Sequence, residues 1–188
     1  MSKEKIYIFD TTLRDGAQTQ GVDFSLNEKE KIAKSLDNLG VDYIEGGWPG
    51  ANPTDTEFFN KDQNFKNANL TAFGMTKKSE HSANNDPMLS SLINSKSKSV
   101  CLFGKAWDFH VDVALGISNN QNLENISESA KHIVSSGKEF MFDAEHFFDG
   151  YKSNAEYAIS CLKSAYDNGA RWIVLCDTNG GTLPHEVS

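Results

Sequence analysis

The sequence lacks the features of a membrane-spanning, secreted or nucleic-acid-binding protein. No apolar segment approaches the roughly 20 residues that cross a bilayer, and the charged start MSKEKIYIFDTTLRDG has no apolar signal-peptide core. The net charge is −8, and no basic run is longer than Lys77–Lys78. Phosphate-rich or anionic lipid surfaces would require clustered cations. We therefore expect a cytoplasmic protein with no nucleic-acid or membrane partner.

Metal-binding and phosphate-binding signatures are also missing. The three cysteines, Cys101, Cys161 and Cys176, are odd in number and show no CxxC spacing. They are typical of small buried apolar residues in a reducing compartment, so a structural zinc site is not expected. The five histidines show no HxH or HExxH spacing, and no GxGxxG or GxxxxGKS loop occurs. The sequence assigns no histidine to a metal.

Apolar strands and amphipathic helices alternate along the 188 residues. The composition is that of a globular protein, for which one domain is the default and two are conceivable. The predicted strands are IYIF (6–9), VDYIE (41–45), LTAFGM (70–75), SVCLFG (99–104), EFMFDAE (139–145) and WIVLCD (172–177).

Helix-start signals lie between these strands. Ser25 to Glu28 fits a capping box, and an apolar face of Ile32, Ala33, Leu36 and Leu39 precedes Gly40, a natural C-cap. A second helix is predicted from a capping box at Ser153 to Glu156, and a third from a proline start at Asn52-Pro53. Two more helices are predicted over about 86–94 and 122–136.

Six strands alternating with five helices predict parallel βα units, either in a doubly wound sheet or in a (β/α)8 TIM barrel. The barrel is favoured because polar residues end several different strands: Asp10, Glu45, Asp143, Glu145 and Asp177. The chain stops at TLPHEVS, in the first turn of a seventh helical unit. We expect residues 1–188 to be the N-terminal portion of a barrel, about six βα units, with strands 7 and 8 absent.

The stretch FDTTLRDGAQTQG, residues 9–21, places a cation and an anion side by side where the first strand ends. Asp15 offers a hard oxygen ligand for Mg²⁺ or Mn²⁺, which Zn²⁺ also accepts. Arg14 stays protonated and would stabilise developing oxyanion character. Gln18 could orient a carboxylate or carbonyl of a substrate. The alternative is a solvated turn that contains an ion pair.

Other strand ends carry candidate chemistry with similar alternatives. Glu45, before GGWPG, would move a proton or hold a neighbouring arginine, or it lies in a tight loop beside a packed tryptophan. Asp143 and Glu145 share one strand face. Either their like charges raise the pKa of at least one of the two carboxyl groups, or the two side chains form salt bridges. Thr178 is placed to hydrogen-bond a carboxylate. His110, crowded by aromatic residues, is more typical of packing than of metal binding.

Four of these stretches together resemble a known family: DTTLRDG, IEGGWPG, DAEHFFDG and VLCDTNGGT. They look like the aldolase-type metal-dependent barrels that condense acyl-CoA with 2-oxo acids. That family includes 2-isopropylmalate, homocitrate and citramalate synthases, with hydroxymethylglutaryl-CoA lyase as a retro-aldol cousin. The resemblance extends along essentially the whole chain, and the strand-two and strand-five motifs are most similar to the citramalate synthase branch.

The resemblance implies roles for individual residues. Asp15 matches the aspartate that binds the divalent metal, which is Mg, Mn or Zn, and Arg14 matches the arginine that stabilises the enolate or ketone oxygen. Gln18 falls near the substrate, and Glu45 aligns with a glutamate that supports catalysis. Glu145 matches a glutamate implicated in acid–base chemistry, and Thr178 matches a threonine that contacts the 2-oxo acid.

The resemblance also implies what this stretch of a catalytic barrel lacks, including the family's C-terminal regulatory region. The family's other two metal ligands come from a His-x-His motif on strand seven, beyond the last residue here. Asp15 alone would bind a metal weakly, so we expect the fragment by itself to be inactive.

The implied activity of the parent protein is an acyltransferase reaction that forms a 2-hydroxy acid from acetyl-CoA and a 2-oxo acid. The citramalate branch would use pyruvate, in branched-chain amino-acid biosynthesis. The alternatives are a 2-isopropylmalate or homocitrate synthase, a hydroxyacyl-CoA lyase that runs the reverse aldol, and a non-catalytic half-barrel that serves as a binding partner. The implied partners are small-molecule substrates and a second copy in a homodimer.

Overall fold

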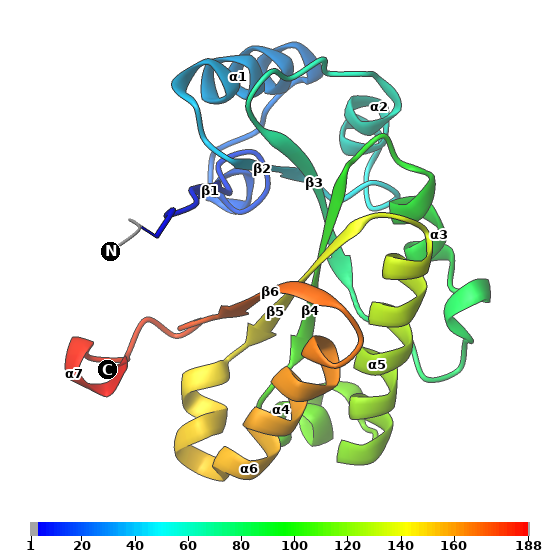
Figure 1. Cartoon of the computed structure of the whole chain (residues 1–188), viewed down its shortest axis with the longest axis vertical. Helices are drawn as coiled ribbons and strands as arrows, with labels where there is room; N and C mark the ends of the chain where they lie inside the picture. Colours follow the sequence, from blue (N-terminus) through cyan, green and yellow to red (C-terminus); the bar gives the residue numbers. More distant parts are fainter. Residues whose placement is uncertain (1–3, 188) are drawn as a thin grey trace. The chain divides into compact units, whose positions relative to one another are not determined.

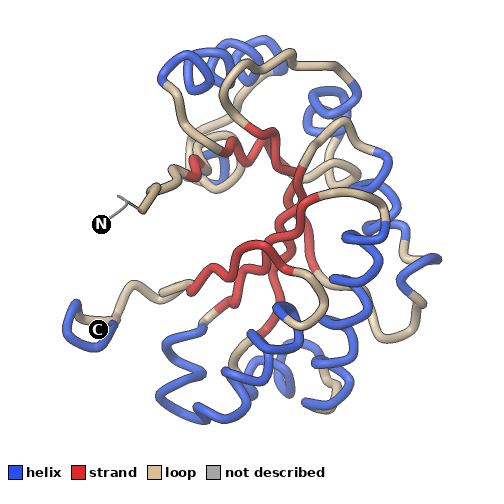
Figure 2. The backbone as a smooth tube through the Cα atoms, viewed as in Figure 1, coloured by secondary structure: helices blue, strands red, loops and turns tan. Residues whose placement is uncertain are grey.

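The computed structural model describes residues 4–187, in which strands and helices alternate along an α/β chain (Figures 1 and 2). The six strands are hydrogen-bonded in their order along the chain, β1-β2-β3-β4-β5-β6. A doubly wound sheet reverses its strand order at a switch point, whereas a (β/α)8 barrel does not. The strand order therefore agrees with the barrel prediction. The strands are β1 Phe9–Asp10, β2 Tyr43–Gly47, β3 Asn69–Met75, β4 Ser99–Lys105, β5 Glu139–Glu145 and β6 Ala170–Leu175.

Helices connect successive strands, and none within residues 4–187 is long and apolar enough to cross a membrane. The α-helices are α1 Leu26–Leu39, α2 Pro53–Asn60, α3 Pro87–Asn94, α4 Asp108–His110, α5 Asn119–Ser135, α6 Phe147–Tyr166 and α7 Pro184–Val187. The shorter helical turns are η1 Gly16–Gln18, η2 Ala83–Asn85 and η3 Val111–Leu115.

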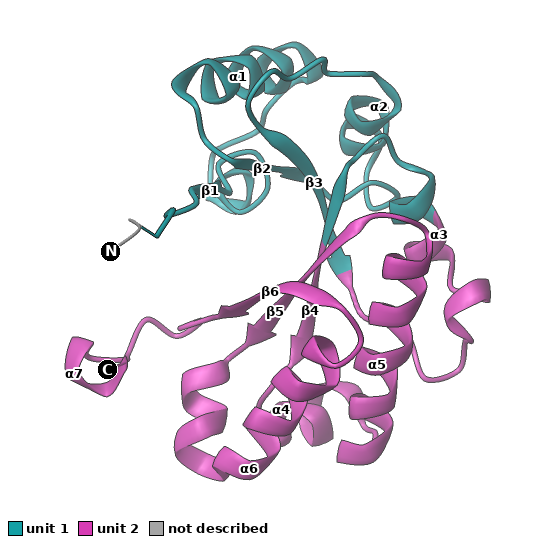
Figure 3. Cartoon of the chain, viewed as in Figure 1, with its two compact units in different colours: residues 1–74, 91–100 teal, residues 75–90, 101–188 magenta. Residues whose placement is uncertain are grey.

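The chain divides into two compact units (Figure 3). Unit 1 comprises Met1–Gly74 and Ser91–Val100, and unit 2 comprises Met75–Ser90 and Cys101–Ser188. Each unit has its own buried apolar side chains. In unit 1 these include Ile44, Phe58 and Phe59, and in unit 2 they include Phe142 and Ile133.

Helix α1 of unit 1 begins and ends as predicted. Ser25 and Glu28 form the capping box, and Gly40 caps the C-terminus with φ of 89°. The predicted buried face is wrong at Leu39, whose side chain is 78% exposed. The buried residues instead follow i, i+4, i+8 spacing at Lys29, Ala33 and Asp37. Two charged residues lie on this face because each has a specific partner, as described below.

The first strand is shorter than the predicted 6–9 and covers only Phe9–Asp10. Ile6 is 81% exposed, so the apolar run is not a buried strand. The carboxylate of Asp42 accepts the backbone N–H of Ile8 at 2.9 Å, while the Ile8 carbonyl accepts two N–H groups from residues 42 and 43. A side chain thus takes the place of a ladder partner, and regular pairing starts only at Phe9.

Unit 2 corrects three further predictions at the ends of elements. Strand β6 ends at Leu175, two residues before the predicted 177, because the Asp177 carboxylate accepts the N–H and hydroxyl of Thr182 and closes a turn. The capping box predicted at Ser153 is wrong by one residue. Helix α6 is kinked at Asn154, whose φ and ψ are −149° and 80°, and Asn154 accepts the N–H of Tyr157 at 3.2 Å. Helix α5 starts at Asn119, earlier than the predicted 122, with a capping box of Ser118 and Gln121.

Asp37→Asn is expected to destabilise unit 1, by about 2 kcal/mol at neutral pH. Burial disfavours the Asp37 carboxylate, but backbone N–H groups of residues 66–68 donate to it and lower its pKa below the ordinary value. Stability from a depressed pKa is present above the unfolded-state pKa and is lost as pH falls through the folded-state pKa. Urea unfolding from pH 7 downward should therefore show a wild-type advantage that shrinks in acid. A constant difference at all pH values would contradict this origin.

Candidate functional site

The loop after β1 is coiled around a single carbonyl oxygen. Thr11 O accepts the backbone N–H groups of Arg14, Asp15 and Gly16, at 3.1, 2.8 and 3.2 Å. Leu13 is fully buried and anchors the loop in unit 1. The neighbouring polar side chains are thereby displayed from a tight turn at the carboxyl end of the strand.

Arg14 is held from two directions within unit 1. Its Nε donates to Oε2 of the fully buried Glu45 at 2.5 Å, and its guanidinium carbon lies 3.9 Å from the centre of the Phe73 ring. Its remaining edge faces the loop, where Nη1 donates to Asp15 at 3.0 Å and to Gln18 at 3.3 Å. Only 16% of the Arg14 side chain is exposed. A planar cation fixed in this way is preorganised for a negative oxygen.

This geometry brings together four of the six sequence-predicted residues: Arg14, Asp15, Gln18 and Glu45. The solvated-turn alternative is right about the ion pair of Arg14 and Asp15, but it does not account for the buried Glu45 or for Phe73. Of the two roles considered for Glu45, holding the neighbouring arginine is the one that the contacts favour.

Asp15 has the chemistry of a metal ligand. Its carboxylate is 65% exposed, and one of its oxygens accepts a hydrogen bond from Arg14. A hard, accessible carboxylate oxygen fits Mg²⁺ or Mn²⁺. The neighbouring Asp10 is engaged differently, because its two oxygens accept the N–H and hydroxyl of Thr12 at 3.0 and 3.2 Å. Asp15 is therefore better suited than Asp10 to act as a metal ligand.

A cavity of about 390 Å³ lies beside Arg14 in unit 1. Both apolar and polar side chains line it, as is usual for a site that binds a small molecule. The lining residues are Leu13, Arg14, Ala17, Gln18, Asp23, Phe24, Lys29, Trp48, Ala51, Asn52, Thr54 and Asp55.

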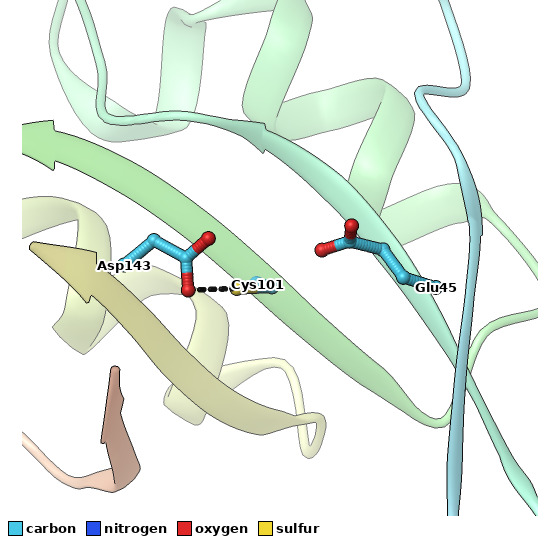
Figure 4. Close-up of side chains that lie close together, drawn as sticks. All are labelled: Glu45, Cys101 and Asp143. Carbon is cyan, nitrogen blue, oxygen red and sulfur yellow. Dashed lines mark hydrogen bonds between the residues drawn. The ribbon is translucent and has the colours of Figure 1, made fainter. Parts of the chain in front are cut away.

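In unit 2 the two acidic residues of β5 each have a partner on β4. The Lys105 ammonium forms an ion pair with Glu145, and the Cys101 thiol donates to Asp143 at 3.1 Å (Figure 4). Cys101 and Cys161 are buried, as the sequence predicts, but Cys176 is only partly buried. Of the two alternatives for this strand face, the salt bridge is therefore realised at Glu145.

Thr178 lies against the residue that follows Glu145. Its hydroxyl oxygen accepts the backbone N–H of His146 at 2.9 Å, which leaves the hydroxyl proton available for another acceptor. His146 has a positive φ of 55°, an uncommon conformation for a residue other than glycine. Its ring contacts Asp149, with 3.2 Å between Nδ1 and Oδ2. Glu145 and Thr178 are thus neighbours in unit 2.

His110 packs among rings, as its sequence context indicates. Its imidazole lies 4.8 Å from the Trp107 ring and 4.4 Å from the His146 ring, centre to centre. Burial lowers the pKa of His110, and electrostatic interactions with His146 and Lys105 lower it further.

Sequence reasoning missed several residues that support the candidate site. Phe73 under Arg14, Asp149 beside His146 and the Lys29–Asp55 pair are all absent from the predicted set. The buried position of Lys29 had a signal, because it shares helical spacing with Ala33. Asp149 lies only three residues after His146, whereas the Phe73–Arg14 and Lys29–Asp55 contacts join segments distant in sequence, for which no local pattern exists.

Parallel βα units in sequential order, with polar residues at the strand ends, define a barrel-class α/β protein. The chain belongs to the HMGL-like family, which it matches over residues 5–188. Among solved structures it resembles the HMG-CoA lyase of Bacillus subtilis, with a TM-score of 0.78 and 18% identity, over 97% of this chain and 61% of that one. This likeness confirms the predicted fold.

Several curated relatives are more similar in sequence. The chain is 55% identical to the (R)-citramalate synthase of Aquifex aeolicus, over 98% of this chain and 35% of that protein. It is 51% identical to the (R)-citramalate synthase of Sulfolobus acidocaldarius, over 100% of this chain and 36% of the relative. The chain is 32% identical to the 2-isopropylmalate synthase of Shouchella clausii, over 98% of this chain and 35% of that protein. The chain thus spans about a third of the length of these relatives.

Proposed function

We propose that this chain is the N-terminal part of the catalytic barrel of a citramalate synthase-type acyltransferase, which condenses acetyl-CoA with pyruvate. One observation carries the proposal: Arg14 is fixed by a buried glutamate and an aromatic face beside the exposed carboxylate of Asp15. The high identity to two (R)-citramalate synthases supports the choice of substrates.

The residues of unit 1 would act on the 2-oxo acid. Arg14 would stabilise the ketone oxygen as it becomes an alkoxide, a charge that exists only as the transition state forms. Glu45 would keep the guanidinium in place, because its own carboxylate is fully buried and already paired. Gln18, which accepts from Arg14 through Oε1, would offer its amide N–H groups to a carboxylate.

The residues of unit 2 would handle protons and the substrate carboxylate. Glu145 is the proposed acid–base residue, and the Lys105 ammonium pairs with its carboxylate. Thr178 is proposed to donate its free hydroxyl proton to the carboxylate of the 2-oxo acid. Asp15 would be the ligand that this chain contributes to a divalent metal of the Mg, Mn or Zn type. Such a metal supplies Lewis-acid polarisation of a carbonyl when it is bound.

A 2-isopropylmalate synthase is the second candidate, because relatives with that activity match almost the whole chain at 31 to 32% identity. The two (R)-citramalate synthases match at 55% and 51%, which favours pyruvate over a branched 2-oxo acid. The lyase alternative has only the fold in its support, at 18% identity. A homodimer and a cytoplasmic location are proposed with the function.

The longest natural product of this gene is expected to release CoA thiol from acetyl-CoA when pyruvate and Mg²⁺ or Mn²⁺ are present. A thiol-reactive dye would follow the release with a panel of 2-oxo acids. A chelator should abolish the release, and Asp15→Asn should raise the metal concentration needed for half-maximal rate. Preference for a branched acid would move the assignment to the sister synthase. No release with any acid would refute the synthase proposal.

A further inference from the structure

A buried ion pair in unit 1 has no part in the chemistry proposed above. Lys29 of α1 and Asp55 of α2 are paired, with side chains that are only 3% and 12% exposed. Burying two charges is costly, and a buried pair often stabilises a fold no better than apolar residues would. This pair therefore calls for a role other than stability.

Asp55 holds the loop that follows β2. One carboxylate oxygen is paired with Lys29, and the other accepts the backbone N–H of Trp48 at 2.8 Å and the Asn52 amide at 2.9 Å. Thr56, next along α2, accepts the N–H of Gly50 at 3.0 Å. The first turn of α2 thus fixes the loop of residues 47–52 at several points.

This loop leads to Arg14 through two aromatic rings. Trp48 packs edge-on against Phe73, with ring centres 5.7 Å apart and planes at 87°. Phe73 also contacts the Arg14 guanidinium, whose central carbon lies 3.9 Å from the ring centre. Lys29, Asp55, Trp48 and Arg14 also line the same cavity. A shift of the loop would therefore reach the guanidinium through packed side chains.

We propose that Asp55, with its charge balanced by Lys29, is a positioning residue that fixes the loop of residues 47–52 and, through Trp48 and Phe73, the orientation of Arg14. The carboxylate is needed because it provides acceptors for the ammonium, a backbone N–H and an amide at once. The part of this proposal that concerns turnover rests on the proposed function, whereas the part that concerns the loop does not.

Hydrogen exchange of the full-length protein tests the loop directly. Asp55→Asn keeps the side-chain volume but replaces one acceptor by a donor. We expect the amides of Gly47, Trp48 and Gly50 to exchange at least tenfold faster, with the amides of residues 66–68 unchanged; Pro49 has no N–H to follow. Asp37→Asn is the matched control: it alters another buried aspartate of unit 1 and should loosen 66–68 but not 47–50. Unchanged protection of 47–50 in Asp55→Asn would overturn the proposal.

Kinetics test the link to Arg14. Asp55→Asn should lower kcat by about tenfold to a hundredfold, since small displacements of a catalytic group cost this much, and should change KM far less. Lys29→Met, which leaves the carboxylate unbalanced, should act in the same direction. Asp37→Asn should keep the wild-type kcat per folded molecule. A loosened loop with unchanged kcat would overturn the link, whereas an inactive wild type would refute the proposed function and leave the exchange result standing.

Discussion

Arg14→Lys in the full-length protein is expected to lower kcat on the order of a hundredfold to a thousandfold, the usual cost of losing one donor to a developing oxyanion. The substitution keeps the positive charge. A lysine ammonium, however, cannot donate to Glu45, lie flat on Phe73 and present a further N–H edge at the same time. We expect KM for the 2-oxo acid to change less, because the lost interaction strengthens only as the alkoxide forms.

The control for this prediction is Arg171→Lys. Arg171 belongs to β6 and lies over the Trp172 ring, with 4.7 Å from the guanidinium carbon to the ring centre. The Arg171→Lys variant therefore loses the same kind of cation–aromatic contact as Arg14→Lys, but no ion pair to a buried carboxylate is lost with it. Steady-state CoA release should be nearly unchanged in Arg171→Lys. Equal losses in the two variants, or unchanged turnover in Arg14→Lys, would remove Arg14 from the catalytic role.

The position of Glu45 explains why charge alone is not enough at residue 14. A fully buried carboxylate requires a partner, and its oxygen lies 2.5 Å from Arg14 Nε. The partner must be a side chain that reaches it from the loop after β1 and still has donors left over. Arginine has five N–H donors in a fixed plane and satisfies both conditions.

Much of the fold could be predicted from the sequence because its signals are local. The apolar runs give the strands, and the capping residues give helix starts such as Ser25 and the proline start of α2. The errors arise where a side chain competes with the backbone. Asp42 takes the N–H of Ile8 before β1, Asp177 closes a turn after β6, and Asn154 caps a kinked helix.

The candidate site could be predicted only in part, for the same physical reason. Residues that follow a strand can be identified from the strand, which is why the sequence predicts Arg14 and Asp15. Glu45 was predicted at the end of a strand, but β2 continues to Gly47 and places Glu45 at its centre. Their supports come from distant segments: Phe73 lies under Arg14, Lys105 pairs with Glu145 forty positions away, and Asp55 pairs with Lys29. No spacing rule connects such residues, so only the folded chain shows them.

Gly47→Ala is expected to destabilise unit 1 by about 2–6 kcal/mol, the sum of backbone strain and overpacking. Gly47 has φ of 136°, which side chains rarely allow, and an added Cβ would lie 2.5 Å from the Asp55 carboxylate carbon. Asp55 cannot move aside freely, because it is paired with Lys29 and accepts the N–H of Trp48. Urea unfolding of the wild-type and variant chains would measure the loss.

Gly40→Ala separates the two causes of that loss. Gly40 also has a positive φ, 89°, but nothing lies within 4 Å of an added Cβ. It should therefore cost only the backbone strain, about 1–2 kcal/mol. If Gly47→Ala were no worse than Gly40→Ala, the carboxylate of Asp55 would have room to yield, and the loop of residues 47–52 would not be fixed. A larger loss of stability at Gly47 would instead show that the backbone there packs directly against the Asp55 carboxylate, because only glycine leaves the space that this carboxylate fills.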